Sequence, residues 1–324
     1  MPAHLFIGAG AGLVSATLFA SAMVASALAG LIIYLCPLPL CLAGLGWGRS
    51  AAGLAGLIGT ILSALLLGPA HALAFALCLA IPVTALVHLI LLSRTSTSLD
   101  NEAKPVLDWY PAGRLVAAAA LIAGTIAALM VLALGPDMAG YNASIDEMLP
   151  RIHDALGAND EVWTPKMAEN LKAVLAKALP AAFAIVWLTV ALFNLWLAGT
   201  IVRRSGHAIR PWPDLHALEI PNVVVLVFAL ALAASFLPGI LGLIGTGFAG
   251  ALLLAYVLQG LAVIHVYSLG VPLRPLLLTV VYLGILFLGW VAIIVAILGL
   301  GEPLFGLRNR ASARPSNQDN DSNT

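Results

Sequence analysis

The stretch that decides the fold is residues 239–269, whose second half reads Tyr256-Val257-Leu258-Gln259-Gly260-Leu261-Ala262-Val263-Ile264-His265-Val266-Tyr267. A helix needs roughly 20 predominantly apolar residues to cross a bilayer, and this stretch exceeds that length. It also holds most of the polar side chains that the sequence places at membrane depth. We therefore expect a membrane-spanning helix here, with the other apolar runs packed around it.

The composition of the whole chain agrees with a membrane protein. Of its 324 residues, 61% are hydrophobic and 9% are charged, against about 25% charged residues in soluble domains. The apolar runs lack the period-two alternation of an outer-membrane barrel. Fifteen acids balance fifteen bases, and the sequence has no block of basic residues of the kind that binds nucleic acid. These features predict an all-α, polytopic bundle in the cytoplasmic (inner) membrane of a bacterium, with the lipid bilayer as its main partner.

The apolar runs predict eight or nine membrane segments. They lie near residues 5–31, 32–46, 51–67, 70–92, 112–134, 179–201, 220–237 and 239–269, followed by a last helix that ends near residue 300. The short second segment contains Pro37 and Pro39, so we expect it to be bent, and it is the first candidate for a segment that does not cross. Basic residues in the links at residues 93–111 (Arg94 and Lys104) and 203–210 (three arginines) predict that those links are cytoplasmic.

This pattern divides the chain into four regions. Membrane helices occupy residues 1–134 and 179–300, an insert outside the membrane occupies residues 135–178, and a disordered polar tail occupies residues 301–324. Two apolar stripes predict that the insert is a pair of amphipathic helices, the second starting at Thr164 and Pro165. The insert either caps the bundle or gates a binding site.

The membrane segments offer little chemistry. None carries Asp, Glu, Lys or Arg near its middle, where proton-driven transporters commonly place carboxylates. His-Glu-x-x-His metal motifs and Gly-x-Ser-x-Gly nucleophile motifs are both missing from the sequence. We therefore expect a protein that is not an enzyme, with no catalytic residue, metal or cofactor.

One stretch, Gly245-Thr246-Gly247-Phe248-Ala249-Gly250, has the glycine spacing of the dinucleotide-binding fingerprint but none of its predicted structural context. The dinucleotide fingerprint requires a preceding strand and a helix N-terminus that faces the pyrophosphate. Here the motif lies inside a predicted membrane helix, so we interpret it as a ridge of small residues for helix packing.

The remaining site candidates are neutral polar residues. Tyr256 and Gln259 lie on one face of their helix, while His265 points nearly opposite Tyr256. Asn194 lies in another predicted membrane helix. Such side chains commonly join helices by hydrogen bonds. Two interpretations therefore stay open for Tyr256, Gln259, His265 and Asn194: helix–helix bonding, or contact with a small solute.

A ridge of small residues also marks the first helix. Gly8, Gly12, Ala16 and Ala20 recur at every fourth position and so share one face. Small residues let another helix approach closely. The ridge predicts either packing within the bundle or docking of a partner subunit.

Three strings carry a resemblance to a known family. They are Pro37-Leu38-Pro39 followed by Gly46-Trp47-Gly48, the string from Tyr256 to His265 quoted above, and Leu298-Gly299-Leu300-Gly301-Glu302-Pro303-Leu304-Phe305-Gly306-Leu307-Arg308. The chain resembles the YybS-like predicted membrane proteins, which carry domain of unknown function 2232. Their layout is similar to that of the substrate-binding subunits of energy-coupling-factor transporters. By that similarity, Ala16 and Ala20 would face a partner subunit, and Tyr256, Gln259 and Asn194 would face a solute.

The leading hypothesis is therefore a solute-binding or transport-related subunit. The sequence has no phosphate-cradling loop, so an ATPase would be a separate protein. The alternative hypothesis is a structural or assembly scaffold for other membrane proteins of the cell envelope.

Overall fold

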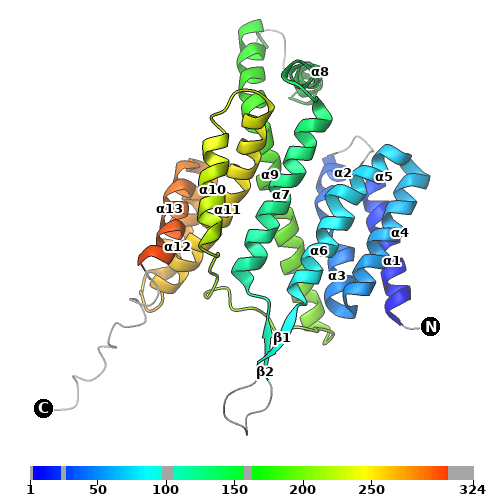
Figure 1. Ribbon diagram of the computed structural model, residues 1–324, viewed down its shortest axis with the longest axis vertical. Helices are drawn as coiled ribbons and strands as arrows, with labels where there is room; N and C mark the ends of the chain where they lie inside the picture. The colour runs from blue at the N-terminus through cyan, green and yellow to red at the C-terminus, as the bar shows by residue number, and fades with distance from the viewer. Residues whose placement is uncertain (1–2, 23–26, 97–105, 157–162, 306–324) are drawn as a thin grey trace, which may run out of the picture.

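The computed structural model describes residues 3–22, 27–96, 106–156 and 163–305, and it is a bundle of helices (Figure 1). The first half contains α1 (Ala3–Ser21), α2 (Ala27–Ile32), η1 (Ile33–Leu35), α3 (Leu38–Trp47), α4 (Arg49–Leu67), α5 (Pro69–Phe75), the π-helical turn η2 (Ala76–Ala80) and α6 (Ile81–Ile90). The second half contains α7 (Ala112–Leu134), α8 (Met138–Leu156), α9 (Pro165–Arg204), α10 (Val223–Ala234), α11 (Ile240–Tyr267), α12 (Arg274–Leu288) and α13 (Trp290–Phe305).

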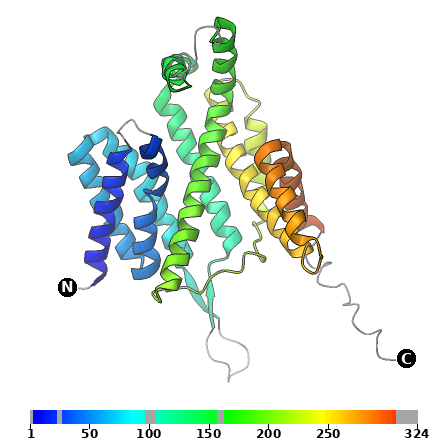
Figure 2. The same cartoon turned by 180° about the vertical axis from the view of Figure 1, so that it is seen from behind.

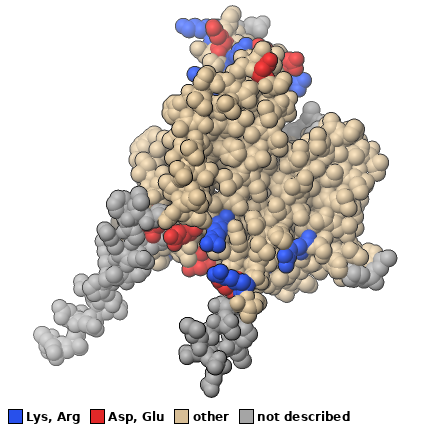
Figure 3. Space-filling view, in the orientation of Figure 1, with Lys and Arg blue, Asp and Glu red and all other residues tan. Residues whose placement is uncertain are grey.

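The helices are long and apolar enough for a polytopic membrane protein. In the described part of the chain, seven helical segments meet the length and composition needed to cross a membrane, and three further apolar helices are shorter. Charged side chains gather at two ends of the molecule, and the surface between them is almost uncharged (Figure 3). Many large apolar side chains are exposed, and Leu65 and Phe287 are each 76% exposed. The predicted all-α membrane bundle is confirmed.

One predicted segment is confirmed in its form and another differs from the observed helices. The proline-containing second segment is broken, as predicted, into α2, η1 and α3, and over residues 30–47 it is long and apolar enough to cross. The predicted last helix is in fact two helices, α12 and α13, joined at Gly289. Gly289 has a φ of 40°, in the left-handed region that favours glycine. As a result, α13 turns back toward the end of the bundle at which α1 begins (Figures 1 and 2).

The insert forms one separate helix and the beginning of a longer one. Its first helix is α8, where Ile145 of the predicted apolar stripe is fully buried. The second begins as predicted, with the Thr164 hydroxyl accepting a hydrogen bond from the Met167 amide at 3.2 Å. It then continues through Pro180 as α9, a helix of 40 residues. The second amphipathic helix and the sixth membrane helix are therefore one element.

The short β-hairpin that follows α6 was not predicted from the sequence. Strands β1 (Ser93–Ser96) and β2 (Val106–Trp109) pair antiparallel, with Arg94 opposite Asp108. The guanidinium Nε of Arg94 lies 2.9 Å from a carboxylate oxygen of Asp108. Residues 306–324, most of the predicted tail, lie outside the described residues, whereas residues 301–305 complete α13.

Helix α11, which contains most of the stretch quoted at the outset, packs against α7, α9, α10 and α13 in the second half of the bundle. Its small residues allow these close contacts. A Cβ atom added at Gly247 would lie 3.0 Å from the Cβ of Ala127, and one added at Gly250 would lie 2.8 Å from the Cβ of Ala181. The glycines of the apparent cofactor motif are therefore helix-packing residues, as interpreted from the sequence.

Candidate functional site: a cavity at the basic end

Gln259 joins α11 to two other parts of the chain. Its side chain is fully buried. Its Oε1 accepts a hydrogen bond from the Ile220 amide at 2.7 Å, and its Nε2 donates to the Gly299 carbonyl at 2.9 Å. Pro303, four residues after Gly299, has no N–H with which to bond that carbonyl. Gln259 thus joins α11 to α13 and to the link before α10 by hydrogen bonds, which agrees with the first of its two predicted roles.

Asn194 is also fully buried and makes bonds of the same kind. Its Nδ2 donates to the carbonyls of Tyr34 and Val190, both at 2.8 Å. Tyr34 lies in η1, beside the helix break at Pro37. Asn194 therefore fastens α9 to the bent second segment.

Tyr256 lies inside the helix packing. It is fully buried, and its ring centroid lies 5.5 Å from that of Phe228 on α10. Its hydroxyl makes no hydrogen bond within the described part of the structure.

The small-residue ridge of α1 is covered by α4 of the same chain. A Cβ atom at Gly12 would lie 2.5 Å from the Ala55 carbonyl oxygen, and one at Gly8 would lie 2.8 Å from that of Ala51. Ala16 is fully buried, and Ala20 is half-buried. The ridge therefore serves packing within the bundle, and Ala16 presents no free surface to a partner.

The bundle contains a cavity of about 480 Å³ at one end. This basic end, defined by the β-hairpin and the link between α9 and α10, carries seven described arginines and four described acids. They are Arg49, Arg94, Arg114, Arg203, Arg204, Arg210 and Arg274, with Asp108, Asp214, Glu219 and Glu302. The apolar walls of the cavity include Leu45, Leu115, Leu192, Leu195, Leu258 and Leu261. Of the four ligand candidates from the sequence, only His265 lines it.

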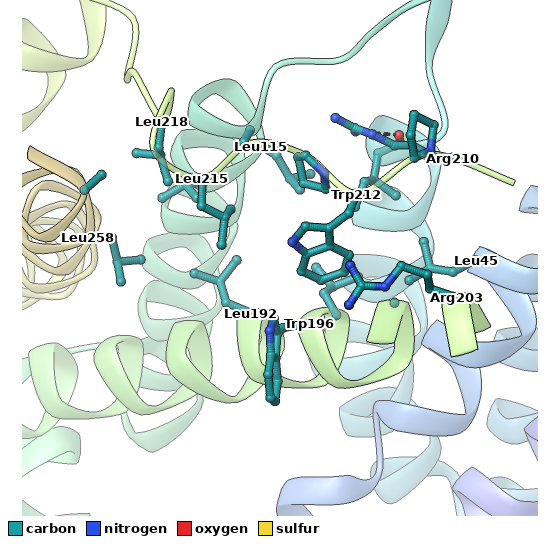
Figure 4. Close-up of a pocket in the computed structure, with 18 of the residues that line it drawn as sticks. Leu45, Leu115, Leu192, Trp196, Arg203, Arg210, Trp212, Leu215, Leu218 and Leu258 are labelled. Atoms are coloured by element: carbon teal, nitrogen blue, oxygen red, sulfur yellow. Dashed lines mark hydrogen bonds between the residues drawn. The ribbon is translucent and has the colours of Figure 1, made fainter. Parts of the chain in front are cut away.

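Arg203 and Trp212 lie together over one wall of the cavity. The guanidinium carbon of Arg203 is 5.1 Å from the centroid of the indole ring of Trp212. Figure 4 shows Trp212 projecting from the link toward α9, with Arg203 beside it. A Cβ atom at Gly199 would lie 2.5 Å from this indole. The ring can therefore pack against α9 at this position because residue 199 has no side chain.

Arg210 joins the link to the end of α6 and to the residue that follows β2. Its Nη1 donates to the Ile90 carbonyl at 2.8 Å, and its Nη2 donates to the Tyr110 carbonyl at 2.9 Å. Burial lowers the pKa of Arg210 from its ordinary value. An arginine nevertheless stays charged in proteins, so this group brings a fixed positive charge to the cavity.

Two histidines and a tyrosine complete the polar lining. His265 Nδ1 lies 2.9 Å from the Leu261 carbonyl, which can only accept, so this nitrogen carries a proton. Its Nε2 faces the Tyr282 hydroxyl at 3.5 Å. The ring centroid of His216 is 6.5 Å from that of His265, and Asp214 lies 3.2 Å from His216 Nδ1. The described lining contains no Asp or Glu.

Sequence reasoning used the basic link only to assign a side of the membrane. It missed Arg203, Arg210, Trp212, His216 and Tyr282 as members of one site. One signal was present, because Trp212 stands between Pro211 and Pro213 next to this cluster of arginines. Prolines restrict the backbone, and a tryptophan held in such a link is suited to a fixed contact.

The comparisons with known proteins give a family and no activity. The chain matches the family described as "Predicted membrane protein (DUF2232)" over residues 13–301, a range that contains every residue lining the cavity. No curated protein and no solved structure matches the chain. Since the match covers most of the sequence and the fold is a polytopic helical bundle, this protein belongs to the DUF2232 family of predicted membrane proteins.

Proposed function

We propose that this protein is a solute-binding, transport-related membrane subunit, without enzymatic activity of its own, and that the cavity at the basic end is its binding site. The protein would lie in the cytoplasmic membrane of a bacterium with this end inside, because arginines favour the cytoplasmic side. Any ATPase that drives transport would be a separate protein.

The observation that carries the proposal is the cavity itself. Its volume of about 480 Å³ lies within the range of roughly 300–1,000 Å³ that is usual for small-molecule sites. Its walls are mainly apolar with a few polar groups, which is the usual composition of such sites. The lining side chains of Trp196 and Tyr282 are 48% and 47% exposed, so the cavity reaches the surface. This combination suits a solute with an apolar body and one polar end.

The proposal is tested by native mass spectrometry of the protein purified from its own host. We expect the wild type to retain a small molecule and Ala262→Phe to lose it, because Ala262 lines the cavity and a phenyl ring there would fill it. The matched control is Ala229→Phe, on an exposed face of α10, which should retain the molecule. Thermal unfolding of each variant shows whether it is folded.

Two outcomes would contradict binding at this cavity. One is a folded Ala262→Phe variant that retains as much of the same molecule as the wild type. The other is a wild type that carries no small molecule and only other envelope proteins. The second result would support the scaffold hypothesis instead.

A further inference from the structure

We infer that the cavity binds a membrane amphiphile that carries a phosphate on a single apolar chain. This inference rests on the proposed function and names the class of its ligand. It is drawn from the order of apolar and cationic residues along the lining helices, and from the absence of carboxylates in the described lining.

The lining residues of α9 form one continuous face of the helix. They are Leu192, Leu195, Trp196, Gly199, Val202 and Arg203, at the three- and four-residue spacing of a single helical face. The face is apolar for most of its length and ends in a guanidinium. A chain lying along α9 would therefore bring its end group to Arg203.

Helix α11 repeats this arrangement. Its lining residues are Leu258, Leu261, Ala262 and His265, again on one face. Both α9 and α11 run toward the basic end (Figures 1 and 2), so both faces change from apolar to polar in the same direction. The cavity thus has an apolar part within the bundle and a polar part at the basic end.

The polar part is suited to an anion. Arg203, Arg210, His216, His265 and Tyr282 all line it, and each can donate a hydrogen bond in at least one protonation state. Neither Arg203 nor Arg210 is in an ion pair with a described residue. The excess of arginines over acids at this end adds a positive field that attracts anions.

A phosphate fits this group of donors better than a carboxylate does. A phosphate monoester has three terminal oxygens and carries more than one negative charge near neutral pH. Arginines recognise phosphates with two parallel hydrogen bonds. Arg203 keeps its whole guanidinium for a ligand, and Arg210 keeps its buried Nε–H unpaired after it bonds the Ile90 and Tyr110 carbonyls. These two groups still provide more N–H donors than the two oxygens of a carboxylate can use.

The test compares dodecyl phosphate, dodecanol and inorganic phosphate as probes. The protein is placed in phosphatidylcholine nanodiscs, and binding is measured by native mass spectrometry. We expect dodecyl phosphate to bind at least about tenfold more tightly than dodecanol, since a hydrogen bond to a charged group contributes about that factor or more. Inorganic phosphate alone should not displace dodecyl phosphate, because it lacks the chain.

The matched variants are Arg203→Gln and Arg204→Gln. Arg203 lines the cavity, whereas its neighbour Arg204 does not. We expect Arg203→Gln to weaken dodecyl phosphate binding about tenfold and to leave dodecanol binding unchanged, with Arg204→Gln within about twofold of the wild type.

Three results would overturn the inference, and they separate it from the proposed function. If dodecanol binds as tightly as dodecyl phosphate and Ala262→Phe abolishes both, the phosphate is not recognised, but the cavity still binds solutes. If inorganic phosphate displaces dodecyl phosphate, the ligand is a soluble anion. If neither amphiphile binds the wild type, and the protein from its host retains nothing that Ala262→Phe removes, both proposals fail.

Discussion

At the scale of single residues, polar side chains inside the bundle complete backbone hydrogen bonds that prolines remove. A proline lacks the N–H that would bond the carbonyl four residues earlier, and an unpaired carbonyl is costly in an apolar medium. Side chains from other helices bond three such carbonyls: Trp187 donates to Cys78 O ahead of Pro82, Tyr141 to Ala176 O ahead of Pro180, and Gln259 to Gly299 O ahead of Pro303. Two of the rare polar groups at membrane depth, Trp187 and Gln259, are therefore explained by backbone chemistry.

Replacing Gln259 tests this explanation. Gln259→Leu leaves the Ile220 amide and the Gly299 carbonyl without their partner. We expect the free energy of unfolding to fall by about 2 kcal/mol, because two buried groups lose a hydrogen bond. The measurement is denaturant unfolding in detergent. The affinity for dodecyl phosphate should not change, since Gln259 does not line the cavity.

Thr246→Val is the matched control on α11. Among the described residues, the Thr246 hydroxyl bonds to the Gly242 carbonyl of its own helix, at 2.8 Å, and to no other helix, so its loss should have a much smaller effect on stability. Equal destabilisation by the two variants would contradict a joining role for Gln259. A loss of ligand affinity in a stable Gln259→Leu variant would restore its predicted role as a solute contact.

At the scale of helices, glycine and alanine set how closely the elements approach. Helices α11 and α13 cross where Gly260 meets the backbone of Val295 and Gly299 meets the backbone of Tyr256. In the same way, Gly12 and Ala55 bring α1 against α4. Packing of this kind holds helices together in lipid, where apolar surface gains nothing by leaving water.

Two glycines of α1 allow a direct test. We expect Gly12→Ala to lower the free energy of unfolding by about 1–3 kcal/mol, because its methyl group would lie 2.5 Å from the Ala55 carbonyl oxygen. Gly10→Ala is the control, since a Cβ atom there meets nothing within 4 Å. This control should be neutral, or stabilising by up to about 1 kcal/mol, because alanine favours a helix more than glycine does. Equal effects of the two substitutions would contradict close α1–α4 packing.

At the scale of the whole molecule, charge separates the two ends. Figure 3 shows charged side chains over α8 and the start of α9 at one end and over the basic end at the other, with an uncharged surface between them. By the positive-inside rule, the arginine excess predicts that the basic end is cytoplasmic and that α8 lies on the opposite side of the membrane.

Cysteine labelling checks this orientation. Glu147 on α8, Thr95 in β1 and Ser205 after α9 are all exposed. We expect a charged, membrane-impermeant maleimide to label Glu147→Cys on intact spheroplasts and to label Thr95→Cys and Ser205→Cys only after lysis. Cys36 and Cys41 are buried and Cys78 is half-buried, and the unmodified protein provides the background. Reversed labelling would place the basic end outside.

The sequence predicted the helical bundle well because long apolar runs leave few alternatives in a membrane. It predicted the start of α9 at Thr164, and it interpreted the glycines near Gly247 as packing residues. It did not predict the break at Gly289. The sequence around a single glycine in an apolar run does not distinguish a helix that continues from one that ends and turns back.

The sequence by itself determined that this chain is an all-α membrane protein and which end of it is basic, because hydropathy and charge are properties of the residues alone. Only the tertiary structure decided which polar groups are used in packing and which line a cavity. Gln259 and Asn194 bond carbonyls that are distant in sequence, whereas Arg203, His216 and His265 line one cavity from different segments. These hydrogen bonds and this shared cavity lining depend on how the helices cross, and helix crossing is set by contacts between residues far apart in the chain.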